Sequence, residues 1–156
     1  MFAPVYQMRR LAIVLDIDGT LLSLACDNPA AMRACLRPHI EAFLDFIFEH
    51  CAAVALWTAG SRGWAEAFRA AVGSRPWAFV WANDRCSGYL KRLKKIWKNP
   101  RLRDKGFRPD TTLIVDDTPA TCCDNYGNAI YIPSYCWGPD VCLVRQIGRA
   151  SCRERV

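Results

Sequence analysis

The sequence lacks any long apolar segment. No hydrophobic run approaches the roughly 18 residues needed to cross a bilayer, and no apolar stretch follows the Arg9-Arg10 pair to form a secretory signal. Hydrophobic residues make up 52% and charged residues 23% of the 156 residues, a balance typical of a globular protein rather than a disordered one. We therefore expect a globular protein that does not cross a membrane and lies inside the cell, in the nucleus or the cytoplasm.

Cysteine pairs at metal-binding spacing are also missing. The nine cysteines are scattered and odd in number, and no two of them form a C-x-x-C pair. Cys122, Cys123, Cys136 and Cys142 have no neighbouring histidine that could complete a zinc site. We interpret the cysteines as reduced thiols of an intracellular protein. Internal repeats, low-complexity stretches and interdomain linkers are absent as well, which favours a single domain.

The last ten residues, 147–156, resemble the translation of a common sequencing adaptor. Gln146 directly precedes them, and the first bases of the adaptor would complete a glutamine codon, so the reading frame agrees. The alternative is a genuine basic C-terminal tail. Without this segment, which carries three arginines and one glutamate, the formal net charge falls from +6 to +4. We expect a single domain over residues 1–146, followed by an artefact tail.

Short apolar runs alternate with amphipathic stretches along the chain. The runs predict buried strands at 11–15, 52–57, 77–81, 112–115 and 129–132. Helical spacing of apolar residues predicts helices over 38–50, 64–72 and 90–97, the first with Pro38 in its first turn. This alternation favours an α/β fold with a mostly parallel sheet and helices on both faces. In such a sheet, ligands bind at the carboxyl ends of the strands.

Two of the predicted strands end in pairs of aspartates. Asp16 and Asp18 follow the first strand, where one carboxylate could attack phosphorus and the other could protonate the leaving oxygen. Asp116 and Asp117 follow the fourth strand and are hard oxygen ligands of the kind that suit Mg²⁺. The alternatives are a polar turn for the first pair and, for the second, an acidic N-cap with Pro119 in the first helical turn. For the second pair, both interpretations are compatible.

The second strand ends in a hydroxyl group that could bind phosphate. Thr58 and the backbone N–H groups of the helix that follows could donate to phosphate oxygens, although Thr58 or Ser61 could equally cap that helix. Phosphoryl transfer also needs a cation to neutralise developing charge. Lys91, Lys94 and Lys95 are candidates, and all three are predicted to lie on the third helix.

Together, these motifs resemble the haloacid dehalogenase superfamily of phosphotransferases. More narrowly, the chain is similar, over nearly its whole length, to the NLI-interacting-factor-like phosphatases that act on the C-terminal domain of RNA polymerase II. The runs that carry this resemblance are LRPHIEAFL at 36–44, LWTAG at 56–60, YLKRL at 89–93 and IVDDTP at 114–119. The sequence departs from that family at Gly19, where glutamate is usual. It also departs in the short stretch from Asp16 to Thr58 and the long one from Lys91 to Asp116.

The resemblance implies the chemistry of the aspartates. Asp16 would be the nucleophile that forms an aspartyl phosphate, and Asp18 would be the general acid and base. Mg²⁺ would be held by Asp16, the backbone carbonyl of Asp18, and Asp117, with Asp116 supporting the metal or its waters. The resemblance therefore implies a Mg²⁺-dependent phosphatase.

The resemblance also implies how phosphate binds and which substrates reach the site. Thr58, Ala59 and Lys91 would bind the transferring phosphoryl group, since the lysine run favours Lys91 over Lys94. No insertion is large enough for a cap domain, so we expect an open site that admits a phosphorylated protein segment carrying phosphoserine or phosphothreonine. The alternatives are a phosphatase of small phosphate esters and a non-catalytic module that binds phosphorylated or acidic partners.

Basic residues are concentrated in one segment. Residues 91–108 contain nine lysines and arginines and one acid, which is half of the 18 basic residues that remain without the tail. The segment could attract an acidic phosphopeptide or a nucleic acid; the alternative is a solvated helix face and loop. Trp97 fits the predicted core better than base stacking, which argues against nucleic acid.

Overall fold

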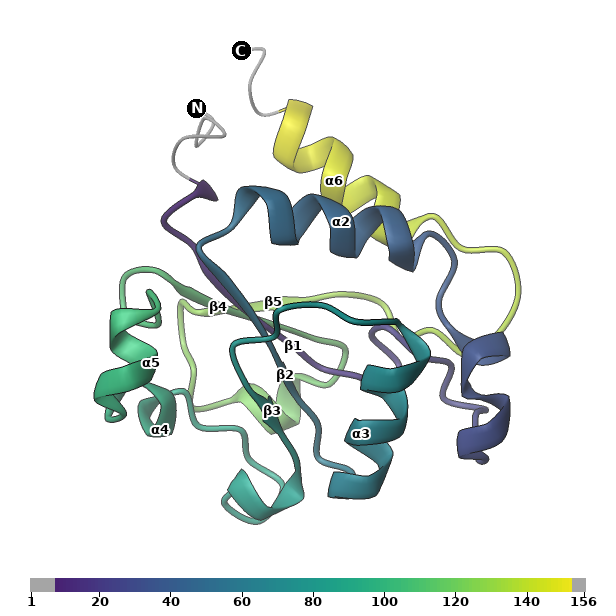
Figure 1. Ribbon diagram of the computed structural model, residues 1–156, viewed down its shortest axis with the longest axis horizontal. Helices are drawn as coiled ribbons and strands as arrows, with labels where there is room; N and C mark the ends of the chain where they lie inside the picture. The colour runs from purple at the N-terminus through teal and green to yellow at the C-terminus, as the bar shows by residue number, and fades with distance from the viewer. Residues whose placement is uncertain (1–7, 153–156) are drawn as a thin grey trace.

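A five-stranded parallel sheet forms the centre of the molecule (Figure 1). The structure is a computed structural model that describes the backbone of residues 8–152 and the side chains of residues 8–147. The strands lie in the order β3-β2-β1-β4-β5, with the bounds β1 Ala12–Leu15, β2 Ala53–Trp57, β3 Val80–Trp81, β4 Thr112–Asp116 and β5 Ala129–Tyr131. The predicted parallel sheet is confirmed. Its order places β1 between β2 and β4, so the three strands that precede the polar motifs are neighbours.

Helices cover both faces of the sheet, as predicted. Ile13 and Leu15 of β1 pack into one apolar cluster, and Ala12 and Val14 into another, because successive side chains of a strand point to opposite faces. The first face is covered by α2 (Ile40–His50), α3 (Arg62–Ala71) and α6 (Cys142–Cys152), and the second by α4 (Lys94–Trp97) and α5 (Pro100–Asp104). Three 3-10 helices complete the described elements: η1 (Pro29–Cys35), η2 (Asn83–Arg85) and η3 (Pro119–Cys122). Burial on both faces explains why β1 is apolar throughout.

Two helices begin later than the sequence predicts. α2 starts at Ile40, because His39 has a φ of 68°, in the left-handed region that a right-handed helix cannot include. The prediction that Lys91 lies on a helix is wrong, since α4 starts only at residue 94. The Asn125 amide donates to the carbonyl of Lys91 (2.6 Å) and accepts from the N–H of Leu93 (3.0 Å). The backbone groups that a helix would use are therefore bonded to a distant side chain.

Other elements differ in extent. β3 forms only two ladder residues, Val80–Trp81, where the sequence predicts a strand over 77–81. Pro100 does not simply end a helix: Asn99 caps a second short helix, α5, which has Pro100 in its first turn. Neither α5 nor α6 is predicted from the apolar spacing.

The C-terminal helix reaches into the segment that resembles an adaptor. The backbone of α6 continues to Cys152, whereas the side chains from 148 onward and residues 153–156 lie outside what the structure describes. The adaptor origin of 147–156 therefore stays a prediction. No helix in the described part of the chain is long and apolar enough to cross a membrane.

The carboxyl ends of the central strands are not covered by a further domain in the described residues. The chain between Thr20 and Pro38 forms only turns, isolated bridges, irregular segments and η1. This agrees with the predicted absence of a cap domain. In the described residues, only loops and η1 therefore lie over the strand ends.

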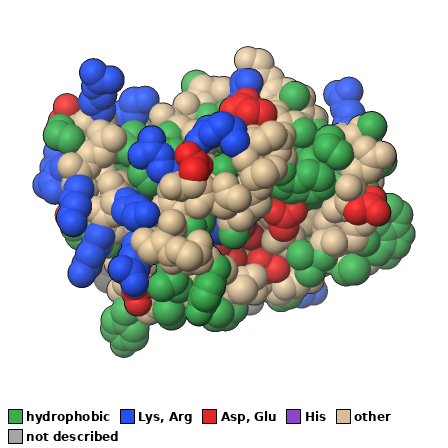
Figure 2. Space-filling model, turned by 90° about the horizontal axis from the view of Figure 1, so that it is seen from below, with side chains coloured by type: hydrophobic (Ala, Val, Ile, Leu, Met, Phe, Trp, Pro, Cys, Tyr) green, Lys and Arg blue, Asp and Glu red, His purple; other side chains and the backbone are tan. Residues whose placement is uncertain are grey.

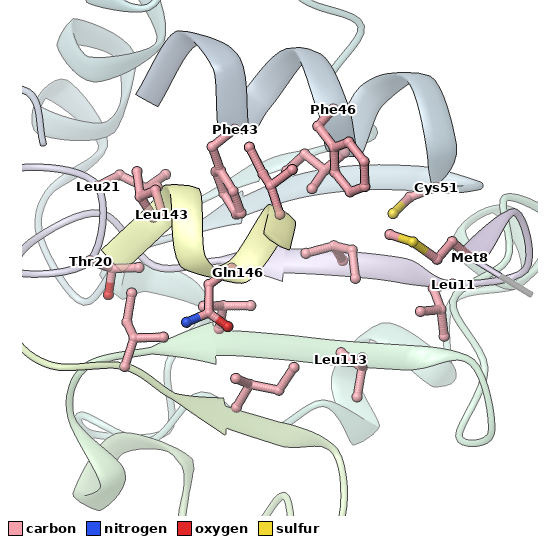
Figure 3. Close-up of a pocket in the computed structure, with 16 residues that line it drawn as sticks. Met8, Leu11, Thr20, Leu21, Phe43, Phe46, Cys51, Leu113, Leu143 and Gln146 are labelled. Atoms are coloured by element: carbon pink, nitrogen blue, oxygen red, sulfur yellow. The ribbon is translucent and has the colours of Figure 1, made fainter. Parts of the chain in front are cut away.

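An apolar cavity of about 420 Å³ lies between α2, α6 and the sheet (Figure 3). Phe43 and Phe46 line it from α2 and Leu113 lines it from β4. Thr20 and Gln146 are the polar residues among its lining, and it contains none of the predicted site residues. The predicted site residues therefore lie at the strand ends and not in this cavity.

Candidate active site

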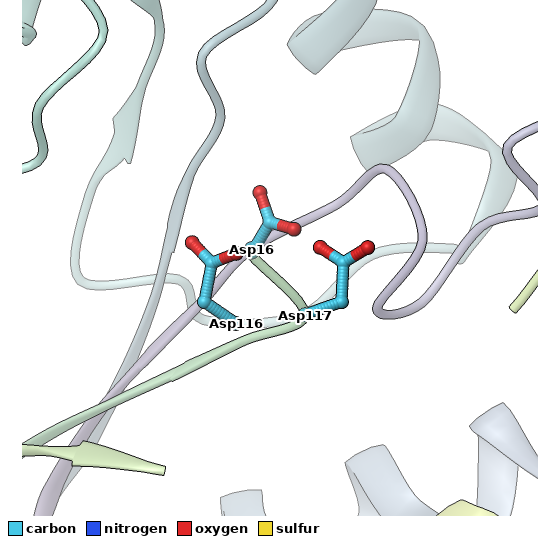
Figure 4. A group of neighbouring side chains, drawn as sticks. All are labelled: Asp16, Asp116 and Asp117. Atoms are coloured by element: carbon cyan, nitrogen blue, oxygen red, sulfur yellow. The ribbon is translucent and has the colours of Figure 1, made fainter. Parts of the chain in front are cut away.

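Aspartates from two neighbouring strands converge at the carboxyl end of the sheet (Figure 4). Asp16 directly follows β1, Asp116 ends β4, and Asp117 is next in the chain. β1 and β4 pair in parallel with Leu15 beside Val115, so the residues that follow both strands emerge side by side. One carboxylate oxygen from each aspartate lies within 4.8 Å of the others. The sheet therefore brings the first and third sequence motifs together.

Lys91 is the cation inside this group of aspartates. Its Nζ donates to Asp16 at 2.6 Å and to Asp116 at 2.7 Å, and its side chain is only 1% exposed. Burial lowers the pKa of the Lys91 ammonium, but the two carboxylate charges outweigh burial and raise the pKa above its usual value. Lys94 is exposed on α4. Of the candidate lysines, Lys91 is thus the one that reaches the carboxylates, and their charges favour its protonated form.

Asp16 is buried and held in place from two sides. One of its oxygens accepts from Lys91 and the other from the hydroxyl of Thr20 at 2.8 Å. Burial raises the pKa of the Asp16 carboxyl; Lys91 opposes the rise and Asp116 adds to it. A divalent cation at this site would favour the ionised form, which is the nucleophilic one.

Asp116 is saturated with protein donors. Besides Lys91, its carboxylate accepts from the backbone N–H of Thr118 at 2.9 Å and from the hydroxyl of Thr121 at 3.2 Å. The bond from the Thr118 N–H shapes the turn after β4. The interpretation of an acidic N-cap is wrong, because the N-cap of η3 is Thr118 and no side chain caps it. These contacts suit a supporting carboxylate better than a direct metal ligand.

Asp117 is the more accessible carboxylate of the pair. It accepts from the hydroxyl of Ser134 at 2.6 Å and from that of Thr118 at 3.1 Å, and no described cation pairs with it. Gly19 allows this position: its φ is +77°, and a Cβ there would clash with Asp117 Oδ2. The glutamate usual at this position in the resembling phosphatases would not fit this backbone without moving Asp117. The departure at Gly19 therefore has a local geometric explanation.

The charge of the group fits a hard divalent cation. Asp16, Asp116 and Asp117 bring three carboxylates together, and Lys91 is the one described amine that neutralises them. Carboxylate oxygens in excess of nearby cations are the donor set that Mg²⁺ prefers. A phosphate dianion would otherwise meet a net negative site. The residues present therefore fit the metal that the resemblance implies.

Asp18 points to a different set of donors. Its Oδ1 accepts from the indole N–H of Trp64 at 2.8 Å, and its Oδ2 accepts from the hydroxyl of Thr58 at 3.2 Å. The side chain of Asp18 is not among the three converging carboxylates. It therefore lies between the end of β1 and the start of α3. The apolar spacing of α3 predicts Trp64 only as a core residue, so sequence reasoning missed its polar contact.

The loop after β2 brings hydroxyl and backbone donors to the same edge. Thr58 is fully buried, and its hydroxyl accepts from the N–H of Gly60 at 3.0 Å while donating to Asp18. Ala59 is exposed beside it, and Ser61 caps α3 by accepting from Trp64 N at 3.2 Å. Ser61 thus takes the capping role, which leaves Thr58 at the site.

Arg37 anchors the loop between Asp16 and Thr20. Its guanidinium is buried, donates to the carbonyls of Gly19 (3.4 Å) and Thr20 (3.1 Å), and forms a bidentate pair with Asp140 at 3.0 Å for each bond. The N–H of Tyr135 also donates to the carbonyl of Gly19 at 2.8 Å. The segment after β5 thus fixes the loop that carries the aspartates. Sequence reasoning used Arg37 only as part of a family run and did not find Asp140.

The fold is similar to that of a solved structure. The described fold is similar to that of Fcp1, an essential RNA polymerase II CTD phosphatase. The TM-score between the two structures is 0.63, and their sequences are 16% identical. The match covers 96% of this chain and 50% of that chain, so this chain spans about half the length of that protein. No curated protein matches the sequence.

The sequence itself matches a family over most of its length. The family described as NLI interacting factor-like phosphatase matches residues 11–148, a range that contains all the strands and every site residue discussed above. The predicted resemblance to this family, within the haloacid dehalogenase superfamily, is confirmed. The chain therefore belongs to the NLI interacting factor-like phosphatase family.

Proposed function

We propose that the chain is a Mg²⁺-dependent phosphatase that transfers the phosphoryl group to Asp16 and acts on phosphoserine or phosphothreonine in protein. The observation that carries this proposal is the buried Lys91 between Asp16 and Asp116, beside the accessible Asp117. A carboxylate next to a fixed cation is suited to attack phosphorus while the cation stabilises charge on the transferring group.

The proposed reaction has two steps. In the first, Asp16 attacks phosphorus, the P–O bond of the ester breaks, and Asp18 gives its proton to the leaving alkoxide. In the second, Asp18 takes a proton from water, whose oxygen attacks phosphorus and frees Asp16 with release of inorganic phosphate. Lys91, the Thr58 hydroxyl and the Ala59 backbone N–H would orient the phosphoryl oxygens. Thr58 would turn its hydroxyl from Asp18 to do so.

The metal would be held by Asp16, Asp117 and the backbone carbonyl of Asp18. When bound, it would neutralise phosphate charge and act as a template for the transfer. Asp116 would orient Lys91 rather than bind the metal directly, because its oxygens already accept from four protein donors. We also propose that these residues form one domain over 1–146, with 147–156 as adaptor-derived sequence.

Accessibility supports a protein substrate. The carboxyl ends of β1, β2 and β4 carry no further domain in the described residues, and Leu24 and Tyr89 are exposed at 53% and 64%. An extended protein segment could approach such a site, whereas a small ester would gain little contact area from it. The open edge therefore favours a phosphorylated protein segment over a small phosphate ester.

Metal-dependent phosphate release is the direct test of the proposed function. We expect the protein to hydrolyse p-nitrophenyl phosphate and phosphoserine peptides with Mg²⁺ and to lose at least about 100-fold of this rate in EDTA, since the carboxylates alone repel phosphate. Restoring Mg²⁺ should restore the rate. Binding of a phosphopeptide without any turnover would instead support a non-catalytic binding module. Turnover of small esters alone would contradict the proposed protein substrate.

Trp64→Phe tests whether Asp18 acts as the proton donor. This change removes the indole N–H that holds Asp18 but keeps an aromatic ring. We expect kcat/KM to fall about tenfold for a phosphoserine peptide, whose alkoxide needs a proton, and less than threefold for p-nitrophenyl phosphate, whose leaving group does not.

A matched change elsewhere controls for the loss of an indole hydrogen bond. Trp97 donates to the Thr112 hydroxyl at 3.1 Å, away from the aspartates. Trp97→Phe should lower stability without changing the ratio between the two substrates. Equal losses on both substrates in Trp64→Phe would show that Trp64 supports folding or binding, and not the proton donor.

A further inference from the structure

Seven exposed cations lie on α4, α5 and the turn that follows them. We call this set the basic surface; it consists of Lys94, Lys95, Lys98, Arg101, Arg103, Lys105 and Arg108. The short helices leave these side chains exposed because the apolar residues between them, Ile96, Leu102 and Phe107, are the ones that pack into the core. The fold therefore turns the basic segment outward as one charged surface.

The cations of the basic surface form no ion pair with a carboxylate in the described residues, and they differ from other unpaired arginines in lying close together in the sequence. Arg62, Arg69, Arg75 and Arg92 each form an ion pair with a described carboxylate. Within residues 8–147, none of the seven cations does so. Lys95, Arg103 and Lys105 donate only to backbone carbonyls. Asp104 is the one acid among these seven cations, and a surface with such an excess of cations has a positive potential that an anionic partner can lower.

The basic surface also has a shape that could receive a chain segment. Lys95, Lys98 and Arg101 line one shallow hollow together with Asn99 and Pro100. Figure 2 shows lysines and arginines gathered on one side of the same face that exposes a group of acidic side chains near its middle. Lys91, which reaches the catalytic aspartates, leads directly into α4. The α4 end of the basic surface is therefore the part closest to Lys91 along the chain, whereas Lys105 and Arg108 contact residues beside the amino ends of β3 and β4.

We propose that the basic surface binds acidic residues that flank the phosphorylated residue of the substrate protein. This inference deepens the proposed function, on which it rests, by assigning the substrate class: phosphoproteins with a run of acidic side chains near the scissile phosphate. The positive charge of the basic surface complements the negative charge of that run. Because Lys91 lies shortly before α4, one substrate chain could contact both the basic surface and the site that binds the phosphate. Binding of the flank would mainly lower KM, because these charges do not touch the reacting atoms.

The composition of the surface favours a protein over a nucleic acid. Binding of single strands usually combines cations with exposed aromatic rings on which bases stack. The two aromatic residues between 94 and 108 are not available for stacking: Phe107 is fully buried, and Trp97 packs against the core and donates to Thr112. A surface that has cations but no exposed aromatic ring suits the carboxylates of a protein better than the bases of a nucleic acid.

Charge reversal on the surface tests the proposal. Two phosphoserine peptides are compared, one with four flanking acidic residues and one with glutamines in their place, each with the flank on either side. We expect wild type to have a higher kcat/KM for the acidic peptide than for the glutamine peptide, mainly through a lower KM. In the double variant Lys98→Glu/Arg101→Glu, the ratio of kcat/KM for the acidic peptide to that for the glutamine peptide should fall about tenfold. The preference should also fall as NaCl rises, because salt screens exposed charges.

The control is charge reversal at a paired arginine on another helix. Arg69 lies on α3 and pairs with Glu66, so Arg69→Glu should leave the preference for the acidic peptide unchanged. If wild type hydrolyses both peptides equally well, or if the double variant keeps the wild-type preference, the inference is overturned while the proposed function stands. No Mg²⁺-dependent release from either peptide would instead refute the proposed function. Tighter binding of a single-stranded RNA than of the acidic peptide, lost in the double variant, would assign the surface to nucleic acid and overturn the inference.

Discussion

Asp16→Asn is expected to lower metal-dependent phosphate release at least about a thousandfold. The carboxylate is the proposed nucleophile, and an amide oxygen cannot form the phosphoryl intermediate at a comparable rate. Asparagine has nearly the same shape and can still accept from Thr20. Lys91 keeps Asp116 at 2.7 Å, so its charge is not left without a partner. The loss should therefore reflect chemistry rather than unfolding.

The experiment compares kcat/KM for p-nitrophenyl phosphate in wild type, Asp16→Asn and Asp124→Asn. Asp124 pairs with Arg92 on the surface and lies outside the group of aspartates, so its variant should stay within twofold of wild type. Beryllofluoride, which mimics a phosphoryl group on a carboxylate, should bind wild type in the presence of Mg²⁺ but not Asp16→Asn. A variant that keeps a tenth of wild-type turnover and an unfolding midpoint like that of wild type would rule out Asp16 as the nucleophile.

The arrangement of the strands was predictable because burial leaves a strong local signal. β1, β2 and β4 are runs of apolar residues, and each is followed at once by polar residues that the core would exclude. In a parallel sheet, all such residues emerge at one edge. The convergence of Asp16 with Asp117 thus follows from apolar runs and from the parallel direction of their strands.

The position of the lysine was only partly predictable. Its residue type and approximate place follow from the chemistry, but the predicted helix over 90–97 would have put Lys91 and Lys95 on one helix surface. Asn125, which lies far along the chain, bonds to the backbone around Lys91 and keeps it out of α4. Helical spacing in this short segment reports which residues are buried, and tertiary hydrogen bonds decide where the helix starts.

Contacts between distant side chains were not predictable from the sequence alone. The apolar spacing of α3 accounts for Trp64 without its N–H, and nothing in the local sequence connects that N–H with Asp18. Arg37 and Asp140 are likewise far apart in the chain and meet only when the segment after β5 returns beneath the catalytic loop. Such pairs depend on the completed fold and carry no periodic signal.

Arg37→Met is expected to destabilise the protein by about 3 kcal/mol. The buried guanidinium donates to Asp140 and to the carbonyls of Gly19 and Thr20, and methionine fills much of its volume without replacing any donor. Removing one partner of a buried ion pair typically costs about 3–5 kcal/mol, and we place this change at the low end because the Asp140 side chain is 21% exposed. Urea unfolding followed by tryptophan fluorescence measures the change.

Two further variants separate charge from geometry at this position. Arg37→Lys keeps a cation but not the bidentate pair, so its free energy of unfolding should lie between those of wild type and Arg37→Met. Asp140→Asn leaves the carbonyl contacts of Arg37 in place and should cost less than Arg37→Met. If Arg37→Met unfolds at the same urea concentration as wild type, the pair does not stabilise the catalytic loop.

The pH dependence of the free energy of unfolding should report the same ion pair through the ionisation of Asp140. The hydrogen bond from Arg37 holds the pKa of the Asp140 carboxyl below its usual value despite the opposing effect of burial. A carboxyl whose pKa is lower in the folded state stabilises the protein above its unfolded-state pKa, near 4. This contribution is lost as pH falls through the folded-state pKa. Wild type should therefore be more stable than Asp140→Asn at pH 6, and the difference should shrink below pH 4. A difference that stays constant over this range would show that ionised Asp140 does not support the loop.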